Sequence, residues 1–183
     1  MIEDIWAEIK TKPGFSRCQM VKSKPPAVTA HSMSECRRLC KDNKCGTYNV
    51  NWGCPQGAGT EEECIGLVKQ YAKAVIIYQR IENVDIHDSE LVSSYSYEHQ
   101  GLCRRMANAM REAGYRDVLP LSNGGCGYCG TCAYPNPCRY PPQMVPSVSA
   151  FGINMDEYIN SLGLNFAFED RAFTLYGVIL YNK

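Results

Sequence analysis

The chain has 183 residues, enough to form one domain around a sizeable hydrophobic core. Its 19 basic and 19 acidic residues cancel, so composition gives no reason to expect nucleic acid or an anionic membrane as a partner. The chain has 11 cysteines, an odd number that argues against a closed disulfide framework. The first residues are acidic without an apolar leader, and no apolar run is long enough to span a membrane. We therefore expect a cytoplasmic protein whose thiols are reduced.

The first part of the chain predicts a helix and then a short strand. Ile2, Ile5, Trp6 and Ile9 recur at helical spacing and are followed by Pro13-Gly14, which stops the helix. Residues 18–21 suit a short strand.

The first cysteine segment, residues 36–54, has the spacing C-x3-C-x4-C-x8-C-P. Its thiols belong to Cys36, Cys40, Cys45 and Cys54, and the closing Cys-Pro is also found in bacterial ferredoxin motifs. We interpret the segment as a loop that binds an iron–sulfur cluster. A four-cysteine zinc knot is the alternative.

The middle of the chain predicts a strand, a long helix and a second strand. Thr60-Glu61-Glu62-Glu63 is a capping box that starts a preceding helix. Residues 74–81 form an apolar strand, Asp88 caps a helix that ends at Gly114, and residues 115–121 form the next strand. We expect the two strands to lie parallel, with the helix as a right-handed crossover. Cys64 and Cys103 lie on or beside apolar helix faces, so we expect both in the core.

The second cysteine segment, residues 126–138, follows this strand directly and reads C-x2-C-x2-C-x5-C. Three thiolates at such intervals can each bind a different iron of a cuboidal cluster, and the fourth returns from a short loop. Neighbouring glycines permit the tight backbone wrap that such a loop needs. Zinc is the weaker interpretation, because structural zinc sites usually use two separated C-x2-C pairs. The proposed ligands are Cys126, Cys129, Cys132 and Cys138.

The last part of the chain predicts a short helix over residues 155–162, capped by Asn154, and a closing strand over residues 172–181. No linker divides the sequence. We therefore expect a single α/β domain over residues 1–183, with a small mixed or parallel sheet, flanking helices and two cysteine-rich cluster-binding loops at residues 36–54 and 126–138.

These motifs resemble a known family. The second segment continues as Cys138-Arg139-x-Pro141 and then Pro146-Ser147-x2-Ala150-x-Gly152-Ile153, which is similar to the "predicted metal-binding protein" family, a domain of unknown function in anaerobic bacteria and methanogenic archaea. Upstream, Cys45-Gly46-Thr47-Tyr48 and Cys54-Pro55 also match, although Gln56 stands where the family usually has a second proline. The resemblance implies metal, most simply iron–sulfur clusters, and anaerobic metabolism, but it supplies no reaction.

The favoured hypothesis is an iron–sulfur protein that carries two 4Fe–4S clusters on the eight named cysteines and transfers single electrons to a redox partner. Association with the family implies a corrinoid methyltransferase system or another anaerobic oxidoreductase as that partner. We expect no catalytic residues, because the chain has no phosphate-binding loop and His31, His87 and His99 lack ligand spacing.

Two alternatives remain. One is an enzyme in which a 4Fe–4S cluster with an open iron site acts as a Lewis acid on a small substrate. The other is a zinc-stabilised interaction module.

Overall fold

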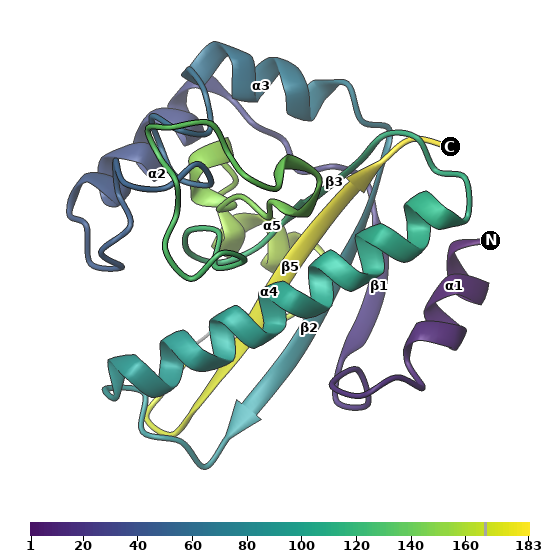
Figure 1. Cartoon of the computed structure of the whole chain (residues 1–183). Helices are drawn as coiled ribbons and strands as arrows, with labels where there is room; N and C mark the ends of the chain where they lie inside the picture. The colour runs from purple at the N-terminus through teal and green to yellow at the C-terminus, as the bar shows by residue number, and fades with distance from the viewer. Residues whose placement is uncertain (167) are drawn as a thin grey trace.

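The computed structural model describes residues 1–166 and 168–183, and a layer of strands runs through its middle (Figure 1). The strand order is β1-β2-β5-β3, with β4 paired to β5. The elements in chain order are α1 (Ile2–Ile9), β1 (Gln19–Ser23), α2 (Ala30–Lys41), α3 (Glu61–Lys69), β2 (Lys73–Glu82), α4 (Ser89–Glu112), β3 (Val118–Leu121), the 3-10 turns η1 (Pro141–Gln143) and η2 (Ser149–Phe151), α5 (Met155–Ser161), β4 (Phe168–Glu169) and β5 (Ala172–Tyr181).

The single α/β domain is confirmed, but the predicted mixed or parallel pairing of the sheet is wrong. Every pairing between the named strands is antiparallel. β2 and β3 do point the same way, as the strand–helix–strand pattern predicted, yet β5 lies between them and pairs with both. The last strand of the chain thus fills the position next to β2. The sequence pattern predicted the parallel directions of β2 and β3 but not the strand between them.

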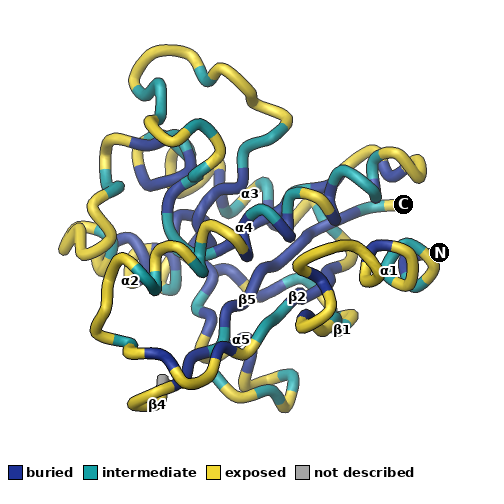
Figure 2. Tube along the Cα trace, turned by 60° about the horizontal axis from the view of Figure 1, so that its bottom comes forward, coloured by how far each residue is buried: buried dark blue, intermediate teal, exposed yellow. Residues whose placement is uncertain are grey.

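Alternation along the two longest strands creates two cores on opposite faces of the sheet. Ala74 and Ile76 of β2 belong to a core shared with α2, α3 and α5. Val75 and Ile77 belong to a second core shared with α1 and α4. Successive side chains of a strand point to opposite faces, so an unbroken apolar strand such as β2 needs cover on both sides. Figure 2 shows both long strands buried along their centre.

The helix starts follow the predicted capping chemistry. The side chain of Thr60 accepts the N–H of Glu63, and Glu63 accepts the N–H of Thr60 in return. Asp88 caps α4 by accepting the N–H of Leu91. Cys64 and Cys103 are buried in the core as expected, at 1% and 0% exposure.

One helix lies where sequence analysis placed a loop. α2 begins after Thr29, whose side chain accepts the N–H of Ser32, and it includes both Cys36 and Cys40. Only the later part of the first cysteine segment is therefore a loop. Among the helices that the structure describes, none is both long and apolar enough to cross a membrane.

Candidate metal centre

The two cysteine segments, 75 residues apart at their point of contact, are joined through the side chain of Asn51. The Asn51 amide nitrogen donates to the carbonyl of Cys126 at 3.0 Å, and its oxygen accepts the N–H of Cys126 at 3.1 Å. The same oxygen also accepts the N–H of Gly53 at 2.8 Å. Asn51 is only 6% exposed, so these bonds form away from water. The first segment thereby fixes the backbone at the start of the second.

Trp52 makes a further link between the segments. Its backbone N–H points at the sulfur of Cys132 at 3.4 Å, and its indole N–H donates to the carbonyl of Asn136 at 2.8 Å. Its ring packs edge-on against Tyr134, with 5.1 Å between centroids. N–H groups aimed at sulfur stabilise negative charge on a ligand thiolate and raise the potential of an iron–sulfur site. This geometry brings a donor from one segment to a proposed ligand of the other.

Helix α4 supports the second segment from the opposite side. The amide of Gln100, 1% exposed, donates to the carbonyl of Gly125 at 3.0 Å and accepts the N–H of Gly127 at 2.8 Å. The ring of Tyr97 lies so close to Gly127 that an added Cβ would be 2.3 Å from its Cδ1. Glycine at this position thus lets the loop approach the Tyr97 ring of the helix closely.

Gly125 has the same role against the first segment. A Cβ at this position would lie 3.0 Å from the sulfur of Cys54 and 2.9 Å from the Cβ of Thr47. The glycines of the second segment thus let two loops meet, in addition to permitting the wrap that sequence analysis assigned to them.

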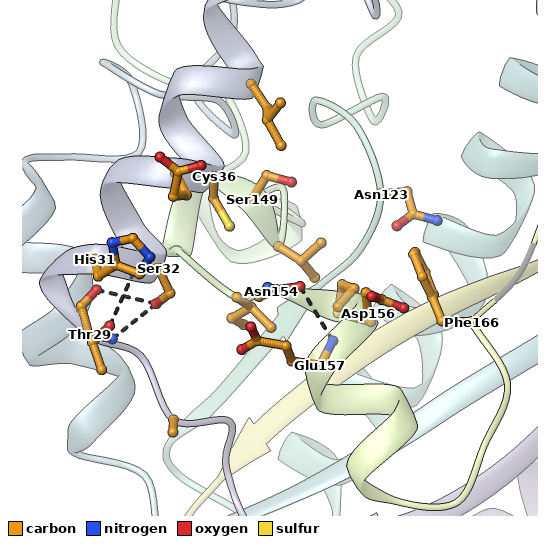
Figure 3. Close-up of a pocket in the computed structure, with 16 residues that line it drawn as sticks. Thr29, His31, Ser32, Cys36, Asn123, Ser149, Asn154, Asp156, Glu157 and Phe166 are labelled. Atoms are coloured by element: carbon orange, nitrogen blue, oxygen red, sulfur yellow. Dashed lines mark hydrogen bonds between the residues drawn. The ribbon is translucent and has the colours of Figure 1, made fainter.

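The thiols of the first segment fall into two groups. Cys54 donates to the hydroxyl of Thr47 at 3.2 Å, and the sulfur of Cys45 lies 3.1 Å from the same hydroxyl. Cys36 instead points from α2 into a cavity of about 660 Å³ between α2 and α5, near Ser149 and Asn154 (Figure 3). Cys45 and Cys54 thus both contact the Thr47 hydroxyl, whereas Cys36 faces the cavity between α2 and α5.

Burial raises the pKa of three thiols of the first segment. It raises the pKa of Cys40 and of Cys54 to about 11, with neighbouring thiols adding to the effect, and it raises the pKa of Cys36 as well. A metal binds the thiolate form, so loading this segment must release protons.

The donor set fits a thiolate-bound metal in chemical kind. All 11 cysteines are free thiols, and the eight proposed ligands come from two segments that contact each other. The side chains do not converge: within the described ranges, no group of three or more His, Cys, Asp or Glu side chains is placed to hold a metal ion. What the structure shows is the backbone junction between the two segments.

Sequence reasoning missed the polar residues that build this junction. Asn51 and Gln100 are single amides without a motif, and such residues usually lie on the surface. Arg37 belongs to a basic stretch, yet it is 8% exposed and donates to the carbonyls of Ala150 and Gly59 and to the sulfur of Cys64. It ties α2 to the turn that follows Cys54. The pattern of charges gave no signal for this role.

Comparison with known proteins identifies a family that is predicted to bind metal. A family model described as "Predicted metal-binding protein (DUF2284)" matches residues 27–181, which include both cysteine segments and the helix that supports the second. No curated protein matches the chain, and no solved structure matches it.

Proposed function

The chain belongs to the family of predicted metal-binding proteins, and from that premise we propose that its cysteine segments bind two 4Fe–4S clusters for one-electron transfer. Cys36, Cys40, Cys45 and Cys54 would hold one cluster, and Cys126, Cys129, Cys132 and Cys138 the other. Bound there, such clusters supply one-electron redox chemistry. A redox partner in anaerobic metabolism, either a corrinoid methyltransferase system or another anaerobic oxidoreductase, would accept or deliver the electron, and a reducing cytoplasm would keep the thiols available.

The observation that carries this proposal is the junction of the two segments. Asn51 fixes the backbone of Cys126, and the N–H of Trp52 points at the sulfur of Cys132. Two independent zinc knots would need no such mutual support. Two redox sites need to be close, and protein N–H groups aimed at sulfur tune their potentials.

The test is anaerobic purification with iron, acid-labile sulfide and zinc counted on one sample. We expect about eight iron and eight sulfide per chain, a broad visible absorption band and a paramagnetic signal after reduction. About two zinc per chain without sulfide would select the zinc-stabilised module and refute the cluster assignment.

An enzyme with an open iron site is the second candidate, and the position of Cys36 favours it. Cys36 faces the cavity between α2 and α5, whereas Cys45 and Cys54 share Thr47 (Figure 3). A cluster held by only Cys40, Cys45 and Cys54 would leave one iron without a thiolate, and such an iron can act as a Lewis acid.

Replacing Cys36 with Ala separates the two candidates. An electron carrier that uses all four thiols of the first segment should lose about four iron per chain. A three-thiolate cluster should keep its full iron content in Cys36→Ala and lose it in Cys54→Ala. If neither substitution changes the iron content, the first segment binds no cluster.

A further inference from the structure

A second cavity, of about 510 Å³, lies between the two cysteine segments and the first half of α4. Cys45 and Thr47 line it from the first segment, and Gly124 and Gly125 line it from the second. The hydroxyl of Thr47 contacts the sulfurs of both Cys45 and Cys54, so this cavity borders the proposed metal ligands directly. Cavities of this size suit a metabolite-sized molecule.

The helix wall of this cavity carries a stripe of hydroxyl groups. Ser89, Ser93 and Ser96 line the cavity, and their spacing places them on one face of α4. Gln100, which holds the second segment, continues that face. Serine inside a helix is less favourable than alanine, because its hydroxyl competes for backbone groups. The stripe therefore lowers helix stability. The hydroxyl of Ser96 donates to the Val92 carbonyl at 2.9 Å, so Ser89 and Ser93 are the hydroxyl donors that the stripe offers to the cavity.

The charge of the lining is positive. Lys44 is the formally charged side chain among the described residues that line the cavity, and the imidazole of His87 lies on the same wall. The carboxylates of Asp85 and Asp88 are not among the lining residues, and they accept the backbone N–H groups of His87 and Leu91. The positive end of the α4 dipole lies at the same end of the helix, where the Asp88 carboxylate caps it.

We propose that this cavity binds a small molecule with an oxyanion, a carboxylate or a phosphate, which Lys44 pairs with and the α4 hydroxyls orient beside Cys45. That the bound anion is a substrate or effector of the metal centre rests on the proposed function. That the cavity binds an anion does not. Ile86 and Val92 supply an apolar wall for the body of the ligand, while Tyr97 and Asn123 offer further polar groups.

Equilibrium dialysis with small probes of different charge tests the proposal. We expect about one equivalent of radiolabelled succinate or orthophosphate to bind per chain, and the preference between them distinguishes a carboxylate from a phosphate ligand. The matched neutral probe, 1,4-butanediol, and the cationic probe, 1,4-diaminobutane, should not bind.

Matched variants locate the site. Lys44→Met should weaken anion binding about tenfold, the effect of losing one charged contact. Lys41→Met, a nearby exposed lysine outside the lining, should bind as the unaltered protein does. Ser93→Met, which fills the cavity from α4, should also abolish binding, with circular dichroism confirming that the helix is intact.

Three outcomes would overturn the site: neither anion binds, the diamine binds as well as succinate, or Lys44→Met and Lys41→Met behave alike. Counting iron and sulfide on the dialysed sample separates this inference from the proposed function. A protein that binds succinate but carries no sulfide refutes the clusters and keeps the anion site. A cluster-bearing protein that binds neither anion refutes the site and keeps the clusters.

Discussion

Asn51 is the residue on which contact between the cysteine segments depends most directly. Its amide satisfies the N–H and C=O of Cys126 and the N–H of Gly53 at a position only 6% exposed. Asn51→Ala leaves these groups without their partner, and we expect a loss of about 2–3 kcal/mol in the free energy of unfolding. Iron content should fall as well, measured against Asn136→Ala, which truncates an exposed side chain of the second segment. Equal iron content in the two variants would contradict a coupling role for Asn51.

His99 gives the stability of the protein a pH dependence of defined sign. Burial lowers the pKa of His99 from 6.5 to about 4, an effect that the Ile77 backbone opposes only in part. The unfolded chain therefore takes up a proton before the folded one does as the pH falls through the range from 6.5 to 4. Stability is unaffected by this group above pH 7.5 and declines below pH 6.5.

Replacing His99 with Leu should remove this contribution. The free energy of unfolding of His99→Leu minus that of the unaltered protein should be roughly 2 kcal/mol larger at pH 5 than at pH 7.5, which means that the variant is relatively more stable at pH 5. Urea unfolding at the two pH values, under anaerobic conditions, measures the difference. A constant offset between the two proteins would show that His99 is not held neutral in the folded state.

At the scale of elements, the close packing of α4 on β5 depends on Gly177. A Cβ at Gly177 would lie 2.1 Å from the sulfur of Cys103, which is buried. Gly177→Ala should therefore cost about 1–3 kcal/mol by overpacking. Gly101→Ala, on the same helix with nothing within 4 Å, should stabilise the protein by up to about 1 kcal/mol because alanine is the better helix former.

A double-mutant cycle checks that the contact itself is responsible. Combining Gly177→Ala with Cys103→Ala removes the sulfur that the new methyl group would meet, so the double variant should lose less stability than the two single losses added together. Strict additivity in thermal unfolding would mean that the helix and strand adjust without that contact.

The elements that sequence reasoning predicted well are those whose signals are local. The capping residues Thr60 and Asp88 place helix starts through bonds within four residues, and the apolar run of β5 marks its own limits. The insertion of β5 between β2 and β3 could not be read in this way, because strand order depends on contacts between residues about 100 apart. α2 was missed because its cysteines suggested a loop and its capping residue, Thr29, stands next to a proline-rich stretch.

The candidate site likewise has some features with a local sequence signal and others that depend on contacts between distant residues. The spacing of the eight cysteines alone identifies them as candidate metal ligands, because free thiols that lie this close together in a sequence are typical of metal sites. The groups that bring the two segments together have no such signal, because Asn51, Gln100 and Arg37 act through backbone groups distant in sequence. The cavity next to Cys45 was likewise beyond sequence reasoning, although the serine spacing on α4 was visible in the sequence.

Taken as a whole, the molecule places the helix that carries Cys36 and Cys40 and the helix that supports the second segment on opposite faces of its sheet. The core of α2, α3 and α5 lies on one face of the sheet, and the core of α1 and α4 lies on the other. Met33 belongs to the first core and packs α2 against η2, where a Cβ on Gly152 would lie 2.8 Å from the Met33 Cα. Phe15 belongs to the second core, in edge-on contact with Trp6 and beneath the guanidinium of Arg105.

Truncating each of these fully buried side chains should therefore have different consequences for the metal. Met33→Ala and Phe15→Ala should each cost about 2–5 kcal/mol, since both positions have 0% exposure. Met33→Ala should lower the iron content more than Phe15→Ala does, because α2 carries two proposed ligands, Cys36 and Cys40, whereas α4 carries none and supports the second segment through Gln100. Both variants are compared at a temperature where circular dichroism shows them fully folded, with iron and sulfide counted per chain. Equal losses of iron would mean that cluster loading follows global stability alone, whereas an intact cluster content in Met33→Ala would show that α2 keeps its place without the core beneath it.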